Sequence, residues 1–436
     1  MYDYRYEPHR LVFMIDNKSF FASCESIRLG LNPMKSVLAV ISRQPDSSWG
    51  SGLIMAASPL AKKKYGLHNV MRARNLPSKK EAPDLMLVDP HMNLYIKRSM
   101  QVLDIFHKYA ADEDIHMYSI DEGMIDMTNS WKLFGDDPYY VARKIQKDIH
   151  DTLGLYTTCG IGENPLLAKL AMDISAKHRE SMIDFWHYID VPDTIWRIPK
   201  LEDVWGINTR TADHLRRLGI NNMYDLAHSN PEIMKREFGE QLYAMSWGVD
   251  RSIIMNKYIP KTKSYSNSQV LNRDYYDQRQ IEIVIREIGE QVAARIRAHN
   301  LRTGKIGLFI GYSFDSIDPD HPRGGFNVQK KITPTNDNHD LTTQLIALFR
   351  NKWQGESVRN IGVDYGDLSL DTSQQFNLFV KPDLQVKRKT LDKTVDSLRK
   401  KYGFSSVVKA SSLLPGATAI RRSKLVGGHN GGNAYE

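Results

Sequence analysis

The sequence predicts an α+β protein of three or four domains, and three observations lead to this prediction. Apolar runs that end in acids alternate with helix signals over residues 1 to 178. Short helical pieces then occupy residues 200 to 250, and elements in the order βαββαβ come after them. A chain of 436 residues with 41% hydrophobic content is long enough to build a packed core in each of these regions.

The first region contains two places where a strand meets acidic residues. LVFMID at residues 11 to 16 is a continuous apolar run, which predicts a strand buried on both faces with Asp16 at its tip. IHMYSIDEGMIDMT at residues 115 to 128 predicts a hairpin with Asp121 and Glu122 near its bend. Helix signals stand beside these strands: Pro90 to Tyr109, Asp137-Pro138 to Leu153, and Asn164-Pro165 with the run LLAKLAMDISAK.

The second region contains a glycine turn at Gly206, within VWGINTRTADHLRRLGI. Helix-like segments on both sides of the turn predict a helix-hairpin-helix motif, whose backbone N–H groups bind a DNA phosphate without reading the base sequence. Gly206 and Asn208 are the candidate DNA contacts. The alternative is an ordinary pair of helices joined by a glycine turn, and this segment alone does not separate the two.

The third region begins after a polar linker at residues 259 to 266. Apolar residues at helical spacing predict an amphipathic helix: Ile281, Ile285, Ile288, Val292 and Ile296. Strands are predicted near 265 to 271, 305 to 313, 325 to 332 and 358 to 370, with a second helix from about 340 to 353. This order is the split-βαβ unit, which leaves one sheet face free for a partner. Residues 381 to 436 are predicted to be a basic segment with a short helix and a disordered Gly-rich end.

Charge is unevenly divided along the chain. Residues 1 to 250 contain 30 Lys or Arg and 33 Asp or Glu, a net charge of −3, whereas residues 251 to 436 contain 29 and 18, a net charge of +11. A surplus of basic residues in one region is typical of a surface that binds the phosphate backbone of a nucleic acid. The alternative is an ordinary solvated surface. Two cysteines, no apolar run near 20 residues and no signal-like N-terminus predict a cytoplasmic protein without a membrane span.

Three carboxylates at strand ends would repel one another, so Asp16, Asp121 and Glu122 predict a divalent cation among them. Oxygen ligands without His or Cys favour Mg²⁺ or Mn²⁺ over zinc. Two such ions about 3.5 to 4 Å apart support an in-line phosphoryl displacement, such as nucleotidyl transfer to a 3′-hydroxyl. The alternative is that the three acids are capping or surface residues in loops.

The segment NKSFFASCE, residues 17 to 25, comes directly after the first acid and predicts a turn from strand into helix. The first backbone N–H groups of that helix, around Ser19 and Phe20, are suited to bind a triphosphate. The ring of Phe21 stands five residues beyond Asp16 and is a candidate for excluding a 2′-hydroxyl from the incoming sugar. The alternative for Phe21 is a core aromatic.

DNKSFFASCE and MYSIDEGMIDM resemble the two metal-binding motifs of the Y-family DNA polymerases, and the similarity looks greatest to the UmuC-like branch, the bacterial ImpB/MucB/SamB type. The resemblance covers about residues 10 to 380 and implies a right-hand polymerase. Its implied parts are a palm at 1–16 and 90–178, small fingers at 17–89, a helix-hairpin-helix thumb at 179–255, a βαββαβ little finger at 264–372, and a clamp-binding peptide with a basic, partly disordered tail at 373–436.

The resemblance also implies roles for single residues. Asp16, Asp121 and Glu122 correspond to the metal carboxylates, with the main-chain carbonyl of Asn17 as a further ligand, and Phe21 corresponds to the steric gate. CGIGENPLLAKLAMDIS is similar to the segment that directs a lysine at the triphosphate, which indicates Lys169, although a solvated lysine paired with Asp173 is the alternative.

The fingers segment AASPLAKKKYG departs from the family pattern. The family's tyrosine and arginine align with Leu60 and Lys63. Leu60 has no hydroxyl group to donate a hydrogen bond. Lys63 keeps the positive charge of the arginine but cannot form its two parallel hydrogen bonds. Lys63 is the candidate triphosphate contact, with the choice among Lys62, Lys63 and Lys64 left open.

The resemblance implies template-directed addition of dNTPs to a primer, with low fidelity and synthesis past lesions in the DNA damage response. Only 104 residues separate Asp16 from Asp121, too few for a large closing fingers domain, and no second acidic cluster indicates a proofreading exonuclease. Two alternatives are a palm-type nucleotide cyclase, which needs no grip on a duplex, and a catalytically silent DNA-binding subunit. The basic C-terminal region argues against the first, and the three intact carboxylates argue against the second.

The peptide QQFNLF, residues 374 to 379, resembles the QxxLF-type peptide by which bacterial polymerases bind the sliding clamp. Its candidate contacts are Gln375, Phe376, Leu378 and Phe379. The alternative is an apolar strand end. The resemblance also raises a UmuD-like or recombinase accessory protein, which no segment of the chain tests.

Overall fold

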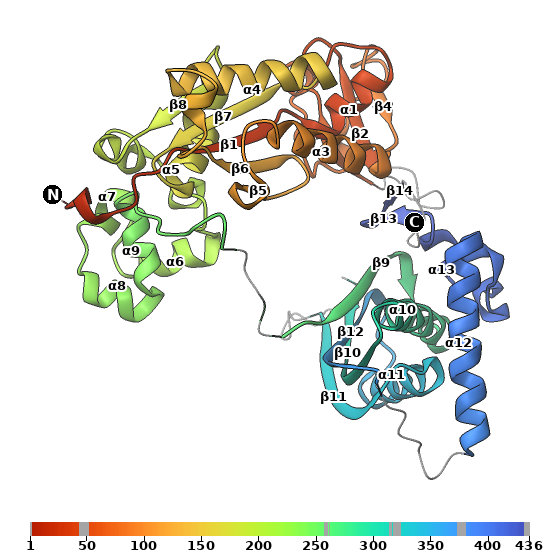
Figure 1. The fold of residues 1–436 in the computed structure, drawn as a ribbon. Coiled ribbons are helices and arrows are strands. Elements are labelled where there is room, and N and C mark those ends of the chain that lie inside the picture. Colours follow the sequence, from red (N-terminus) through yellow and green to blue (C-terminus); the bar gives the residue numbers. More distant parts are fainter. Residues whose placement is uncertain are drawn as a thin grey trace.

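The computed structural model describes residues 2–42, 52–256, 260, 262–313, 316, 324–372 and 381–430. This part of the chain contains two large sheets, of five and four strands, and two small ones, of three and two strands, together with their helices (Figure 1). None of the helices in the described ranges is long and apolar enough to cross a lipid bilayer.

The first sheet has the strand order β5-β6-β1-β7-β8, so the N-terminal strand lies at its centre. Its strands are β1 (Val12–Asn17), β5 (Ile115–Met117), β6 (Glu122–Asp126), β7 (Thr157–Gly162) and β8 (Ile183–Trp186). Phe13 and Ile15 pack with helices α3 (Met92–Phe106) and α4 (Pro138–Leu153), whereas Val12 and Met14 pack on the other face with residues near α5 (Pro165–Leu170). The apolar run predicted a strand buried on both faces, and β1 is one.

The described residues between β1 and α3 include a smaller unit, in the region where the fingers were expected at 17–89. It consists of α1 (Phe20–Arg28), β2 (Leu38–Ser42), β3 (Leu53–Ala57), α2 (Pro59–Tyr65) and β4 (Met86–Val88), with the sheet order β3-β2-β4. The expected boundary at residue 178 falls too early, because β8 pairs in parallel with β7 and belongs to the first sheet.

A helical unit comes next, made of α6 (Thr209–Arg217), α7 (Met223–Ala227), α8 (Pro231–Phe238) and α9 (Glu240–Ser246). Gly206 lies in a turn with a φ of 92°, which favours glycine. The element immediately before it is a 3₁₀ turn of three residues, Leu201–Asp203, so the segment before Gly206 is shorter than the helix that the sequence predicts.

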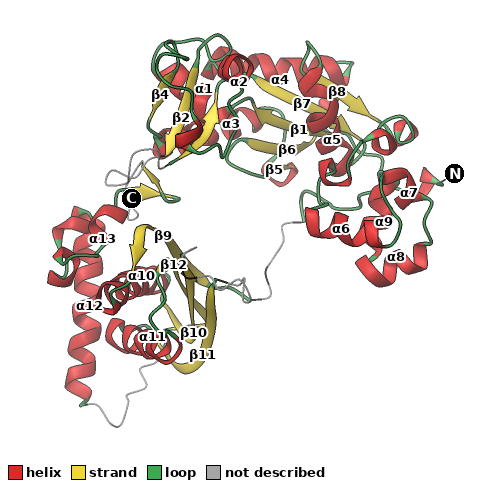
Figure 2. Ribbon diagram, turned by 180° about the vertical axis from the view of Figure 1, so that it is seen from behind, coloured by secondary structure: helices red, strands yellow, loops and turns green. Residues whose placement is uncertain are grey.

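The second large sheet is antiparallel, with the order β11-β10-β12-β9, and the βαββαβ prediction is confirmed. Its elements are β9 (Tyr265–Tyr275), α10 (Gln278–Ala298), β10 (Leu301–Tyr312), β11 (Gly325–Thr335), α11 (Asn338–Lys352) and β12 (Val358–Leu370). Both helices cover the same face of the sheet, and Figure 2 shows this arrangement with the molecule turned by 180°.

The C-terminal segment corrects one expectation. Instead of a short helix it contains α12 (Pro382–Tyr402), a helix of 21 residues, with α13 (Ala419–Arg422) and a small hairpin, β13 (Leu425–Val426) and β14 (His429–Asn430), after it. Part of the Gly-rich end therefore has regular structure, at residues 427 to 430. The predicted clamp peptide, including Gln375, Phe376, Leu378 and Phe379, lies outside the described residues.

Candidate active site

Strand register brings the predicted acids together. Asp16 and Glu122 are directly opposite each other in the antiparallel pair β1 and β6, and Asp121 immediately precedes β6. The backbone N–H of Asn17 donates to the Asp121 carbonyl at 2.9 Å, and the Asn17 side-chain amide donates to the same oxygen at 3.0 Å. Ser119 donates to the Asp121 carboxylate at 2.6 Å. The two predicted motifs therefore form one site at the end of the central strands.

The electrostatics of this site are those of crowded acids. Burial raises the pKa of Asp16 to about 6, and the neighbouring charges of Asp121 and Glu122 act in the same direction. The ammonium group of Lys177, 3.5 Å from the Asp16 carboxylate, opposes this rise. Without a metal, keeping these crowded carboxylates ionised therefore costs free energy, and a bound cation would remove this cost.

Two lysines neutralise part of this charge. The Lys169 Nζ lies 2.8 Å from the Glu122 carboxylate and 3.0 Å from that of Asp173, so it takes part in the site and also makes the helix pair given as its alternative. Lys177 lies 2.9 Å from Asp173 and bridges it to Asp16. Burial alone would lower the pKa of each lysine, but the acids beside them outweigh burial and raise it.

Lys177 was not predicted from the sequence. The available signal was its spacing, since Lys169, Asp173 and Lys177 stand four residues apart and can share one helix face. The structure interrupts α5 at Ala171–Ser175 with a π-helical turn before the 3₁₀ turn that carries Lys177. A π-helical turn rotates the residues after it relative to a regular helix, so no regular helix pattern places Lys177 over Asp16.

Two strand glycines let this helix approach the sheet. A Cβ atom at Gly160 would overlap the Ala168 carbonyl oxygen and the Met172 backbone nitrogen, and one at Gly162 would overlap the Ala168 nitrogen. Asn164 begins α5, and its side chain accepts the Leu167 N–H at 2.9 Å. The close approach is what puts Lys169 and Lys177 within reach of the carboxylates.

The segment after Asp16 forms the second wall of the site. Ser19 adopts a left-handed backbone, with φ 49° and ψ 46°, and α1 begins at the next residue. Phe20, expected beside the nucleotide, has its ring buried in the core, so its ring is not available to a nucleotide. Phe21 is half-buried and stacks on Tyr95, with ring centroids 4.6 Å apart.

The position of Tyr95 is fixed by a hydrogen bond to the buried carboxylate of Glu25. The Tyr95 hydroxyl donates to Glu25 at 2.7 Å, and the fully buried Glu25 also binds His91 at 2.9 Å and Arg28 at 2.7 Å. This network limits the positions that the Phe21 ring can take. None of these supporting residues was predicted from the sequence.

Among the three adjacent lysines of α2, the structure favours Lys62 over Lys63. Burial lowers the pKa of Lys62, and the charges that act on it are those of Asp16, Lys177 and Lys18. Lys63 is exposed, and Lys64 pairs with Asp84 at 2.6 Å. Of the three lysines, Lys62 is thus the half-buried one whose charge interacts with that of Asp16.

The predicted DNA-binding turn lies near the same site. The indole N–H of Trp205, next to Gly206, donates to the Tyr118 hydroxyl at 3.1 Å, and the Lys169 Nζ lies 5.8 Å from the Tyr118 ring centroid. Asn208 caps α6 by accepting the Thr211 N–H at 2.9 Å. The Asn208 side chain thus has a structural partner already.

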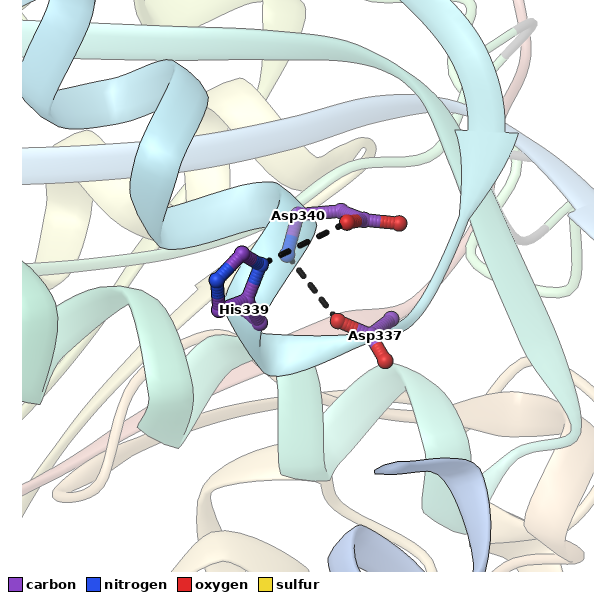
Figure 3. A group of neighbouring side chains, drawn as sticks. All are labelled: Asp337, His339 and Asp340. Atoms are coloured by element: carbon purple, nitrogen blue, oxygen red, sulfur yellow. Dashed lines mark hydrogen bonds and ion pairs between the residues drawn. The ribbon is translucent and has the colours of Figure 1, made fainter. Parts of the chain in front are cut away.

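The donor set around Asp16 suits a hard divalent cation. It consists of carboxylates, and the buried hydroxyl of Thr158, directly opposite Asp16 in β7, has no hydrogen-bond partner among the described residues. A second group, Asp337, His339 and Asp340, lies at the start of α11 (Figure 3). Asp337 accepts the Asp340 N–H at 2.9 Å as a helix cap, so local structure explains that group.

Comparison with known proteins matches both halves of the chain. Residues 15–173 match the family model described as impB/mucB/samB family, and residues 262–378 match the model of the C-terminal domain of that family. The first match contains all three carboxylates and the second contains the whole of the second large sheet.

Relatives align over nearly the whole chain. A protein named "Putative UV-damage repair protein UvrX" from Bacillus subtilis (strain 168) is 35% identical, over 98% of this chain and 100% of its own. A "DNA polymerase IV 2" from the same organism is 32% identical, over 96% and 98%. A solved structure, a Y-family DNA polymerase chimera of Dbh and Dpo4, has a TM-score of 0.64 at 21% identity and covers 83% of this chain and 99% of its own.

Proposed function

The chain belongs to the impB/mucB/samB family of Y-family DNA polymerases, and on this premise we propose that it extends a primer 3′-hydroxyl with dNTPs under the direction of a DNA template. The observation that carries the proposal is the register that sets Asp16 opposite Glu122 beside Asp121, with Lys169 and Lys177 over them. The names of its relatives, a UV-damage repair protein and a DNA polymerase, support DNA synthesis in the damage response, and the proposal adds that this synthesis has low fidelity and passes lesions.

Two Mg²⁺ ions, with Mn²⁺ as a substitute, would be held by Asp16, Asp121 and Glu122 and by the main-chain carbonyl of Asn17. When bound, the ions activate the 3′-hydroxyl and stabilise the leaving oxygen. The lysines that now neutralise Asp16 and Glu122 would then be free to bind the triphosphate. Lys169 and Lys177 would thus pair with the carboxylates in the metal-free site and with the triphosphate when the metal ions are bound.

The incoming nucleotide would lie between these lysines and the start of α1. The backbone N–H groups at Ser19 and Phe20 would bind the triphosphate, with Lys62 in the place for which the sequence favoured Lys63. The ring of Phe21 would meet the sugar and exclude a 2′-hydroxyl.

DNA would be held from two sides. The turn at Gly206, with Asn208 beyond it, would bind the primer-template backbone, and the free face of the second sheet carries a polar groove for the duplex, lined in part by Ser266, Lys305 and Gln329. The clamp peptide would tether the enzyme at a primer end through Leu378 and Phe379. A UmuD-like or recombinase accessory protein remains part of the proposal as a partner.

Extension of a primed template with dNTPs and Mg²⁺ tests this function. Asp121→Asn and Glu122→Gln should each abolish extension, while Asp126→Asn, at the far end of β6, should leave it intact. Synthesis past an abasic site is expected of the wild-type protein. Tight primer binding without any extension would favour a silent DNA-binding subunit, and turnover of nucleotides without DNA would favour a cyclase.

Clamp tethering needs a separate test. Leu378→Ala together with Phe379→Ala should remove stimulation by the sliding clamp and leave extension without the clamp unchanged. Stimulation that survives the double substitution would contradict this assignment.

A further inference from the structure

Helix α12 lies beside α10 and α11, the two helices of the second large sheet (Figure 1), and polar side chains make its contacts with them. Arg297 of α10 is almost fully buried, and its guanidinium binds the Asp396 carboxylate at 2.7 Å and that of Asp392 at 3.6 Å. The backbone N–H and the side-chain amide of Asn338 donate to Asp392 at 2.9 and 2.8 Å. Ion pairs and hydrogen bonds, rather than apolar contacts, therefore hold this helix in place.

Apolar side chains of α12 point away from that contact. Leu384, Leu391, Leu398 and Tyr402 are 43%, 62%, 37% and 61% exposed. Their spacing of seven, seven and four residues puts them on one stripe, the spacing of the seam of a coiled coil. This leucine stripe, as we call these four residues, runs about 27 Å along the helix axis. An amphipathic helix normally buries such a stripe, so its exposure indicates a missing partner.

Charge around the leucine stripe restricts that partner. The helix contains seven Lys or Arg and three Asp, and two of the three Asp residues face inward onto Arg297 and Asn338. Lys387 and Lys401 stand beside the stripe at helical spacing, and neither is ion-paired with a carboxylate in the described part of the chain. A complementary surface is therefore apolar at its centre and acidic along the edge that faces Lys387 and Lys401.

We propose that the leucine stripe of α12 docks an acidic amphipathic helix of another protein. A second copy of this chain would bring two basic edges together, which repel. A bilayer would need a broad apolar face, whereas polar Thr390 and Thr394 adjoin this narrow seam. The docking surface lies apart from the carboxylates, so it adds a partner to the chain and does not depend on polymerase activity.

A designed peptide tests the proposal on the full chain. The probe is a fluorescent helix of about three heptads with Leu at the seam positions and Glu at the flanking positions, and its twin carries Lys in place of Glu. Fluorescence anisotropy should show binding of the acidic probe at least about tenfold tighter than of the basic twin, and weaker binding at high salt. Leu391→Ser with Leu398→Ser should weaken acidic-probe binding at least about tenfold.

The matched control is Leu133→Ser, at a leucine that is 80% exposed outside this helix, and it should leave probe binding unchanged. Thermal unfolding and unassisted primer extension should be unaltered in all variants, because the substituted side chains are exposed. Equal affinity for the two probes, or an affinity for the acidic probe that the leucine substitutions leave unchanged, would overturn the proposal. So would a wild-type dimer that these substitutions dissociate, or leucine-dependent binding to phosphatidylglycerol vesicles.

Discussion

At the scale of single residues, the carboxyl group of Asp16 shows how the active site trades stability for metal binding. The usual pKa of an aspartate is near 3.8, and burial beside Asp121 and Glu122 raises that of Asp16 to about 6 in the fold. The folded protein therefore binds this proton more tightly than the unfolded chain does. Without metal, ionising Asp16 destabilises the fold as the pH rises from about 4 to about 6.

We predict that Asp16→Asn stabilises the metal-free protein by up to about 3 kcal/mol at pH 7.5, because the variant has no charge to bury. The difference from wild type should shrink as the pH falls and vanish toward about pH 3, where Asp16 is protonated in both the folded and the unfolded state. Thermal unfolding in EDTA across this pH range measures it, with Asp126→Asn as the control. A variant less stable than wild type at pH 7.5 would contradict the prediction.

Sugar selection is a second property of single residues. Phe21→Ala should raise the use of ribonucleotides relative to deoxyribonucleotides by roughly 10 to 200-fold, because the ring no longer excludes the 2′-hydroxyl. Tyr95→Ala should have a smaller effect in the same direction, since it removes the ring stacked on Phe21. Tyr95→Phe keeps the stack and is the matched control. The ratio of kcat/KM for the two nucleotides measures the effect, and unchanged selection in Phe21→Ala would rule out the steric gate.

At the scale of elements, the contact between β7 and α5 sets the distance between lysines and carboxylates. Gly160→Ala should destabilise the protein by about 2–4 kcal/mol, because the added Cβ overlaps the helix backbone at Ala168 and Met172 and the helix must move out. The same shift should reduce primer extension by drawing Lys169 and Lys177 away. Denaturant unfolding measures the stability change.

Gly307→Ala is the control for this substitution. Gly307 also lies in a strand, but a Cβ there would meet its nearest neighbour, a side-chain atom of Asp364, at an ordinary contact distance of 3.4 Å. Its effect on stability should be small. Equal effects of the two substitutions would show that the close approach of α5 is not the cause.

At the scale of the whole molecule, the basic C-terminal region predicts a strong salt dependence of DNA binding. Lys305 lies on the free face of the second sheet, and Lys305→Ala should weaken binding of every DNA sequence alike and reduce the slope of log K against log salt by about 1. Lys147→Ala, on the outer helix α4, is the control. Binding titrations at several salt concentrations measure both, and an unchanged slope for Lys305→Ala would contradict a phosphate contact there.

Much of this molecule is predictable from local sequence. The apolar run before Asp16 and the hairpin around Asp121 and Glu122 each carry their own pattern, and β-strands with those patterns form where they were expected. The βαββαβ order is predictable from alternation and helical spacing in the same way. Local patterns suffice here because burial of a strand or a helix face depends on residues that are close in sequence.

Other features depend on contacts between distant segments, which only the tertiary structure decides. Three features join residues far apart in the chain: the contact of Lys177 with Asp16 after the π-helical turn, the choice of Lys62 over Lys63, and the support of Phe21 by Tyr95. The outward leucines of α12 are of this kind too, because a helical pattern shows that two faces differ but not which face the neighbouring domain covers. The sequence by itself thus determined the elements and the acids they carry, and tertiary packing decided which side chains meet, since each meeting requires two independently formed surfaces to come together.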